Sequence, residues 1–311
     1  MTQVRTPAVS TTAGREEFLA DFQQYRPLLL GLAYRLLGSM WDAEDTVQDA
    51  YLRLAGTDWC QVQQPRAYLI TVVSRLALDR LRSAQVRRED YTGPWLPEPI
   101  DTASLGPLDT AELRDSVSYA TMHMLERLSP PQRAVFVLRE AFGVPYEDIA
   151  SVVGVPPANC RQLLLRARRR LADGARRPAG SAPASSTPEE HSRLLVSFLD
   201  AARTGDLQAL NGLLADDVVA WNDGGGRVRA ARRPITGRQQ VLAFVAGLAG
   251  RYDIGEARLV EVNGHPALHT HLAGGEQLVA LRVVEGRIQE IYALLNPDKL
   301  GRLAEIATAG G

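Results

Sequence analysis

Apolar residues in the first half of the chain recur with the spacing of helix faces. Six of them lie three or four residues apart: Phe18, Phe22, Tyr25, Leu29, Leu32 and Leu36. This spacing predicts an amphipathic helix that ends at Gly38. A second helix is expected from Asp42 and a third over 65–83, and the helical pattern returns over 111–174. The first half is therefore predicted to be all-α.

The pattern changes after residues 178–188, which are rich in Pro, Ala and Ser and are typical of a flexible linker. Beyond them, three stretches have helical spacing: 189–203, 207–214 and 238–248. Six runs have the pattern of strands separated by glycine-containing turns: 218–221, 227–231, 259–262, 267–271, 278–284 and 288–295. The second half is therefore predicted to be an α+β domain.

Residues 146–170 have the pattern of a helix–turn–helix. The apolar positions of its two helices are expected to face inward: Ile149, Ala150, Val153, Leu164, Ala167 and Leu171. Gly154 between the helices can adopt the positive φ of a tight turn. Five polar residues are available on the outer face of the second helix: Asn159, Arg161, Gln162, Arg166 and Arg169. Such side chains can read base edges in the major groove and bind phosphates; a helical hairpin with a solvated charged face is the alternative.

The formal net charge of −1 hides local basic clusters. Six arginines lie within 66–88 and seven within 161–177, and 34 of the 35 basic residues are Arg. Clustered basic charge favours nucleic-acid binding. The two cysteines lack a metal or disulfide spacing, and no run of 18 apolar residues occurs. We therefore expect a cytoplasmic protein in a reducing compartment, with no membrane segment and no metal site.

Three segments of the first half resemble bacterial sigma factors, the subunits that direct RNA polymerase to promoters. Residues 42–54 resemble the polymerase-clamp-binding helix, residues 65–83 the helix that reads the minus-ten element, and residues 132–171 the sigma-4 domain that reads the minus-thirty-five element. Many family members carry Asn where this chain has Arg75. The short chain is similar to the extracytoplasmic-function type.

This resemblance implies the partners and the residues that contact them. The partners are core RNA polymerase, through its beta-prime clamp and beta flap, and promoter DNA. The polymerase-binding residues would be Asp45, Gln48 and Asp49. The minus-ten set would be Arg75, Arg80, Arg82, Arg87 and Arg88. The minus-thirty-five set would be the five outer residues of the helix–turn–helix, and the free chain is expected to be monomeric.

Residues after 189 resemble the SnoaL-like cone that a subgroup of sigma factors, including the SigJ type, carries at the C-terminus. Three short motifs mark this subgroup: WLPEP at 95–99, DGGGR at 223–227 and NPDKL at 296–300. The implied domains are sigma-2 at 15–92, a connector at 93–118, sigma-4 at 119–177, a linker at 178–188 and the SnoaL-like domain at 189–308. The fold class is thus two all-α sigma domains plus an α+β cone.

The three motifs are expected to form an interdomain regulatory interface near sigma-2. The residues assigned to it are Trp95, Glu98, Asp223, Arg227, Asp298 and Lys299. Glu98 is expected to pair with Arg227 or Lys299. The alternative is that the motifs are only a rigid loop, a hairpin turn and a helix cap.

SnoaL-like cones often enclose a pocket with an acid/base pair, so catalysis or ligand sensing by the C-terminal domain stays open as an alternative. The residues that could serve it are Asp223, His265, His269 and His271. His269 and His271 alternate by two and should share one sheet face. Our preferred interpretation is a sigma factor without catalytic activity or cofactor, regulated in cis by its C-terminal domain, with a small-molecule ligand of that domain as a further alternative.

Overall fold

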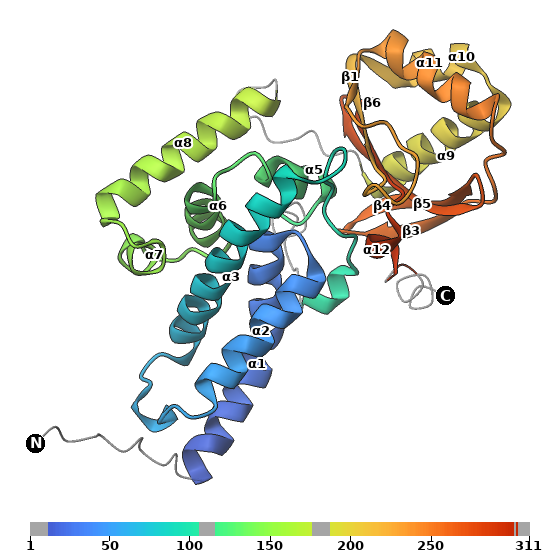
Figure 1. Ribbon diagram of the computed structural model, residues 1–311. Helices are drawn as coiled ribbons and strands as arrows, with labels where there is room; N and C mark the ends of the chain where they lie inside the picture. Colours follow the sequence, from blue (N-terminus) through green and yellow to red (C-terminus); the bar gives the residue numbers. More distant parts are fainter. Residues whose placement is uncertain (1–11, 106–115, 176–186, 302, 304–311) are drawn as a thin grey trace, which may run out of the picture. The chain divides into compact units, whose positions relative to one another are not determined.

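The computed structural model describes residues 12–105, 116–175, 187–301 and 303 (Figure 1). These residues form two compact units, which we describe separately. The helical unit comprises Met1–Gln85, Ala103–Leu108 and Leu125–Arg176. The sheet unit comprises Val86–Thr102, Asp109–Met124 and Arg177–Gly311. The sheet unit therefore contains most of the connector between the two predicted sigma domains, in addition to the C-terminal residues.

The helical unit begins with the three helices that the apolar spacing predicts. They are α1 (Thr12–Leu37), α2 (Met40–Leu54) and α3 (Pro65–Glu89), with a short 3-10 turn, η1 (Trp59–Gln61), before α3. Gly38 ends α1 with a φ of +70°, and the Ser39 side chain caps α2 by accepting a hydrogen bond from the backbone N–H of Asp42. Aromatic rings of α1, α2 and η1 pack together in the core.

The rest of the helical unit contains the helix–turn–helix. Its elements are η2 (Thr102–Leu105), α6 (Pro130–Phe136), the π-helical turn η3 (Val137–Ala141), α7 (Tyr146–Val153) and α8 (Pro157–Ala175). Gly154 caps α7 in the left-handed conformation, with a φ of +79°, as predicted. Ile149, Leu164 and Ala167 are buried between the helices. The predicted helix–turn–helix is therefore confirmed.

In its described residues, the sheet unit contains a six-stranded sheet and helices that lie before and between the strands and after the last one. The helices are α5 (Tyr119–Leu125), α9 (Pro188–Thr204), α10 (Leu207–Leu213), α11 (Arg238–Ala249) and α12 (Pro297–Leu300). Leu125, the last residue of α5, belongs to the helical unit. The strands are β1 (Leu214–Asp223), β2 (Ile235–Thr236), β3 (Arg258–Val262), β4 (His265–Leu272), β5 (Gly275–Val284) and β6 (Arg287–Leu294). Their order is β2-β1-β6-β5-β4-β3, and only the β1–β6 pair is parallel. This is the α+β arrangement expected of the SnoaL-like cone.

One predicted strand of this domain was wrong. Residues 227–231 form a turn and an irregular loop rather than a strand. The backbone N–H groups of Arg227 and Val228 both donate to the carbonyl of Gly224, at 2.9 and 3.0 Å. Because these N–H groups close a tight turn after the three glycines, this part of the segment is not available for a sheet ladder.

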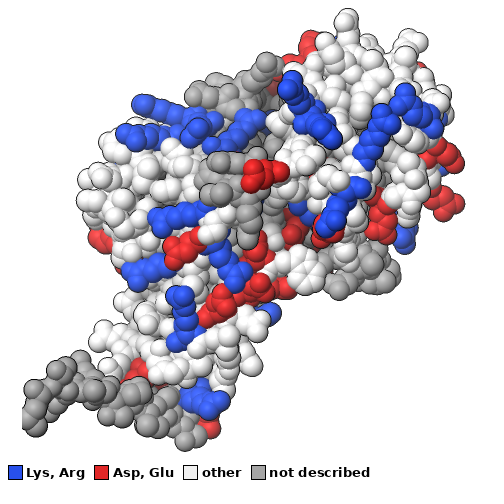
Figure 2. Space-filling model, in the orientation of Figure 1, with Lys and Arg blue, Asp and Glu red and all other residues white. Residues whose placement is uncertain are grey.

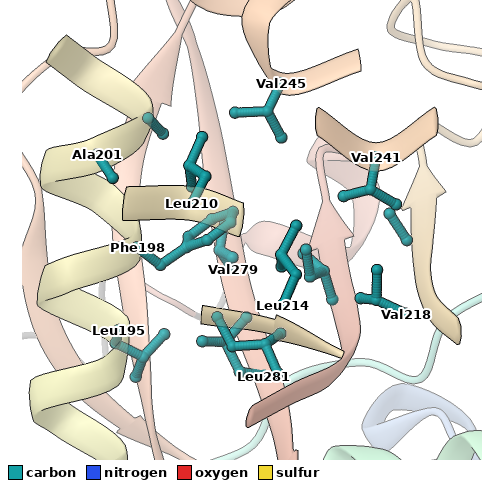
Figure 3. Packing of buried hydrophobic residues seen from close by; sticks show 14 of the residues in the cluster. Leu195, Phe198, Ala201, Leu210, Leu214, Val218, Val241, Val245, Val279 and Leu281 are labelled. Atoms are coloured by element: carbon teal, nitrogen blue, oxygen red, sulfur yellow. The ribbon is translucent and has the colours of Figure 1, made fainter. Parts of the chain in front are cut away.

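One face of the sheet is covered by the helices of the same domain. Figure 3 shows the apolar side chains of this core between α9, α10, α11 and the strands. Leu195 and Phe198 come from α9 and Leu210 from α10, while Val218 and Leu281 come from the sheet. Side chains of a strand alternate between the two faces, so the remaining residues of each strand point to the opposite face of the sheet.

The opposite face is covered by the connector and by Tyr119, the first residue of α5. Leu96 and Tyr119 pack in a second core with Leu278, Tyr292 and Leu294. These three sheet residues lie in register across β5 and β6: Leu278 faces Leu294, and Ala280 faces Tyr292. The connector therefore forms a third layer on the sheet.

Shortening a core side chain in α10 tests this packing. Leu210 is fully buried, whereas Leu207 in the same helix is 46% exposed. We expect Leu210→Ala to destabilise the sheet unit by about 2–5 kcal/mol through the cavity it leaves. Leu207→Ala should change stability by less than about 1 kcal/mol. Urea unfolding followed by tryptophan fluorescence measures both, and equal effects would contradict the described core.

Candidate functional site

Asp223, at the end of β1, is the centre of a buried polar cluster in the sheet unit. Its side chain is fully buried. One carboxylate oxygen, Oδ1, accepts hydrogen bonds from the hydroxyl of Tyr91 at 2.6 Å and the backbone N–H of Gly225 at 3.0 Å. The other, Oδ2, accepts from the backbone N–H of Leu96 at 2.9 Å and from Nζ of Lys299 at 2.8 Å. Four donors satisfy this carboxylate, so no substrate can reach it as a general base.

Lys299, in α12, supplies the countercharge. Its Nζ also donates to the carbonyl of Leu96 at 2.6 Å. The ammonium lies 4.0 Å from the ring centroid of Trp95 and 4.9 Å from that of Tyr91, within range of cation–π attraction. Lys299 is only 8% exposed. We call Tyr91, Trp95, Leu96, Asp223 and Lys299 the pin cluster.

Burial and the ion pair with Asp223 shift the pKa of Lys299 in opposite directions. Burial lowers the pKa of Lys299 to about 8, although Asp223 raises it in part. The lysine therefore still carries its proton at neutral pH. Burial, together with the neighbouring Asp223, raises the pKa of Tyr91. Tyr91 thus remains a hydrogen-bond donor to the carboxylate.

The motif around the pin cluster requires glycine and a capped helix. A Cβ at Gly224 would lie 2.4 Å from the carbonyl oxygen of Val228, and one at Gly225 would lie 2.3 Å from the Asn296 side chain. Asn296 caps α12 by accepting from the backbone N–H of Asp298, and it donates to the hydroxyl of Tyr91 at 2.9 Å. The DGGGR and NPDKL motifs therefore pack against each other.

Asn263 holds both described ends of the connector. Its backbone N–H donates to the carbonyl of Ile100 at 2.9 Å, and its Oδ1 accepts from the N–H of Ile100 at 3.3 Å. Its Nδ2 donates to the carbonyl of Val117 at 2.8 Å. The Tyr119 hydroxyl adds a hydrogen bond to the carbonyl of Pro97. The connector is thus fixed to the sheet before and after residues 106–115.

Sequence reasoning did not identify Asn263 or Tyr91. Asn263 has a φ of +54° in an Asn-Gly turn between β3 and β4, and such a pair predicts only a hairpin turn. Tyr91 carries no motif signal beyond its place four residues before Trp95. A conformation suited to a turn does not show which distant segment the side chain contacts.

The other residues assigned to the interdomain interface have different partners. Arg227 forms an exposed ion pair with Asp298, with Nε 3.1 Å from Oδ2. Glu98 is buried, and its charge contributes to raising the pKa of Lys299. The guanidinium of Arg88 lies 3.7 Å from the ring centroid of Trp95. Arg88, assigned to the minus-ten set, therefore lies against the WLPEP motif.

In the helical unit, the predicted polymerase-binding and minus-ten residues meet on one surface. Arg80 in α3 pairs with Asp49 at 2.7 Å and with Asp45 at 3.4 Å, both in α2. Asp45 and Gln48 are exposed. Two further minus-ten residues have other partners: Arg75 donates to the carbonyl of Ser151 in α7 at 2.9 Å, and Arg82 pairs with Asp79. The side chain of Arg87 lies outside the described residues.

The outer face of α8 carries the predicted minus-thirty-five residues. Asn159, Arg161, Gln162, Arg166 and Arg169 are all exposed, and the surface over α8 is strongly basic (Figure 2). Cys160, Leu164 and Ala167 on the opposite side are buried. This division between a basic outer face and an apolar inner face is typical of a recognition helix.

The histidines of the sheet unit do not gather into a metal site. The rings of His269 and His271 lie 5.9 Å apart, and those of His191 and His265 lie 6.0 Å apart. Burial lowers the pKa of His191 to about 4. In the described part of the chain, no three His, Cys, Asp or Glu side chains are placed to hold a metal ion.

None of the helices in the described residues is long and apolar enough to cross a membrane.

Comparisons with known proteins give consistent matches. Residues 22–87 match Sigma-70 region 2, and residues 119–171 match Sigma-70, region 4. The chain is 38% identical over 295 residues to the ECF RNA polymerase sigma factor SigJ of Mycobacterium tuberculosis, covering 90% of this chain and 92% of SigJ. It is 32% identical over 307 residues to SigI of the same species, covering 91% and 95%. The crystal structure of M. tuberculosis SigJ matches with a TM-score of 0.73 at 33% identity, covering 91% of this chain and 98% of SigJ.

Removing the buried countercharge tests the pin cluster. Lys299→Met would leave Asp223 buried without its cation, so we expect a loss of about 3–5 kcal/mol in the stability of the sheet unit. Arg227→Met is the matched control, because its ion pair with Asp298 is exposed and should contribute only about 0–1 kcal/mol. Urea unfolding measures both variants. A Lys299→Met protein as stable as Arg227→Met would show that the buried pair contributes little.

Proposed function

Because the chain belongs to the extracytoplasmic-function sigma factors, which direct RNA polymerase to promoters, we propose that its C-terminal domain regulates this activity in cis by holding the connector between sigma-2 and sigma-4. The observation that carries the proposal is the buried ammonium of Lys299, which lies 2.6 Å from the carbonyl of Leu96 and 2.8 Å from the carboxylate of Asp223. This one side chain joins the WLPEP, DGGGR and NPDKL motifs.

The C-terminal domain holds the connector at more than one point. The pin cluster holds Leu96, and Asn263 holds Ile100 and Val117. Because Ile100 and Val117 are both held by Asn263, the separation between these two points of the connector is fixed. The C-terminal domain therefore limits how far the two promoter-reading domains can separate.

A contact within the helical unit indicates which state this restraint favours. Arg75, in the minus-ten set, donates to the backbone of Ser151 in the helix–turn–helix. On a promoter, the minus-ten and minus-thirty-five elements are roughly 25 base pairs apart, on the order of 80 Å at 3.4 Å per base pair. The two readers cannot touch each other and occupy both elements. We propose that the described arrangement is a closed state and that connector docking stabilises it.

The surface of α2 supports its proposed role in binding the beta-prime clamp. Trp41, Asp45, Gln48 and Leu52 follow the i, i+4, i+7, i+11 spacing of one helix face. Trp41 is 56% exposed and Leu52 is 63% exposed. Exposed aromatic and aliphatic side chains that flank polar ones are typical of a docking face. Asp45, Gln48 and Asp49 would supply its polar contacts to the clamp, and sigma-4 would contact the beta flap.

The proposed role of the C-terminal domain does not involve catalysis. Asp223, the acid of the alternative acid/base pair, is fully buried and accepts four hydrogen bonds. The sheet face that packs against Leu96 and Tyr119 is covered by the chain's own connector, so it is not available to a second copy. The first observation argues against a catalytic role, and the second supports a monomeric regulator that acts in cis.

Base recognition by α8 can be tested with two arginines of the same helix. Arg161 lies on the outer face near the start of α8, whereas Arg168 pairs with Glu140 at 2.9 Å. Loss of one base contact typically removes about 1–3 kcal/mol of discrimination, so Arg161→Ala should reduce run-off transcription about 5- to 150-fold. Arg168→Ala should stay within about threefold of wild type. If Arg168→Ala were the more defective variant, the assignment of the recognition face would be wrong.

Regulation in cis can be tested by run-off transcription with core polymerase. Lys299→Met should release the connector and raise output at limiting polymerase, as should truncation after Leu295. Leu210→Ala is the control, because it destabilises the same domain without touching the pin cluster. Unchanged output from Lys299→Met and from the truncation would contradict the proposal. An equal rise with Leu210→Ala would also contradict it, because general unfolding would then explain the effect.

The single lysine of the chain gives a direct readout of release. Lys299 is the only lysine in the sequence, so an amine-reactive reagent can label only this side chain and the N-terminus. In the free protein its burial should protect it. If polymerase binding undocks the connector, Lys299 labelling measured by peptide mass spectrometry should rise in the complex. Protection that is equal in the free and bound states would show that the connector remains docked during initiation.

A further inference from the structure

The glycine-rich loop after β1 forms one wall of a pocket that the pin cluster does not use. The pocket has a volume of about 260 Å³ and lies between this loop and the Thr92–Gly93 segment of the connector. Asn222 and three arginines, Arg227, Arg229 and Arg232, are among its lining residues, and no Asp or Glu lines it in the described part of the chain. All the charged side chains that line the pocket in the described part of the chain are therefore positive.

A buried amide lines the pocket and lacks an acceptor. Asn222 is only 6% exposed, and its Nδ2 has no hydrogen-bond partner among the described residues. Asn222 is the second-last residue of β1, two positions before the first residue of the glycine-rich loop. A buried donor without a partner costs about 1–3 kcal/mol. An acceptor group bound in the pocket would remove this penalty.

The three arginines of the pocket differ in whether they already form an ion pair within the protein. Arg227 pairs with Asp298. Arg229 and Arg232 also line the pocket, are exposed, and form no ion pair with a described residue. A planar guanidinium donates two parallel hydrogen bonds to a phosphate or a carboxylate. Two guanidinium groups and a buried amide donor can together donate hydrogen bonds to the oxygens of one anion.

Close approach of the backbone gives the pocket its shape. A Cβ at Gly226, whose φ is +71°, would lie 3.2 Å from the Thr92 side chain, and one at Gly93 would lie 3.7 Å from the Cα of Arg232. These two glycines let the loop and the connector approach each other across the pocket. A ligand held here would touch both segments.

We infer that this pocket binds a small phosphorylated or carboxylated molecule, whose anionic group accepts from Asn222 Nδ2 and from the guanidinium groups of Arg229 and Arg232. The volume fits a compact anion rather than a drug-sized ligand, for which pockets of about 300–1,000 Å³ are usual. The inference does not depend on the regulatory role of the connector, because it concerns binding alone. If both are correct, the ligand would strengthen connector docking, since it touches both segments.

Titration calorimetry of the full-length protein with inorganic phosphate tests the site, with malonate as a carboxylate probe. We expect one-site, saturable binding of at least one probe. Asn222→Asp keeps the size of the side chain but places a carboxylate in the pocket, and Arg229→Gln with Arg232→Gln removes the cations. Each change should weaken binding about tenfold or more, which corresponds to about 1.4 kcal/mol. Arg233→Gln is the matched control, because Arg233 is in the same loop but does not line the pocket.

The outcomes separate the site from general surface charge and from DNA binding. Absence of saturable binding of both probes to the wild type would overturn the inference. Equal weakening by Arg233→Gln would overturn it too, because diffuse charge would then explain binding. If the double variant bound phosphate normally but lost affinity for a random-sequence DNA duplex, the arginines would serve DNA phosphates instead. Since Asn222→Asp can disturb folding, circular dichroism checks it, and the arginine variants decide independently.

Discussion

The arrangement of the sheet unit depends on one buried ion pair, between Lys299 and Asp223. Moving two charges out of water costs several kcal/mol for each ion, and only good geometry and further hydrogen bonds offset this cost. Both requirements are met: the carboxylate has four donors, and the ammonium has two oxygen acceptors and two aromatic faces. Every other basic residue in the chain is Arg. A compact ammonium can sit between a carbonyl, a carboxylate and two rings, whereas a planar guanidinium requires a wider, flat site.

The ion pair acts together with a sheet that has both faces covered. Helices α9–α11 cover one face, and Leu96 of the connector and Tyr119 at the start of α5 pack on the other. Undocking the connector would therefore expose apolar side chains of β5 and β6 and remove two of the four donors of Asp223, the Tyr91 hydroxyl and the Leu96 N–H. Under the proposed regulation, both penalties would arise at the same step, which would make partial release unfavourable and favour a two-state equilibrium between docked and undocked forms. Only a partner that binds the undocked state more tightly can shift this equilibrium.

The sequence was sufficient where the signal was local. The spacing of apolar residues located α1, and Gly154 located the turn before the recognition helix. Resemblance brought Trp95, Asp223 and Lys299 together, because their motifs are specific even though the residues are far apart in the chain. Residues 227–231 were misassigned, since alternation of Arg, Val and Ala has the period of a strand, but the preceding glycines close a turn. Asn263 could not be found, because the direction of its amide depends on the packed connector rather than on its neighbours.

The ion pairs between α2 and α3 relate polymerase binding to DNA binding. Arg80, which resemblance assigns to DNA, is bound by Asp45 and Asp49, which resemblance assigns to polymerase. These side chains are 30–68% exposed, and ion pairs at such sites contribute only about 0–1 kcal/mol. A basic polymerase surface that binds α2 would compete with Arg80 for the two carboxylates at little energetic cost. Arg80 would then be free to contact a phosphate. If these assigned roles hold, competition for the same carboxylates would couple the two binding events through direct contacts, without any change in the fold of sigma-2.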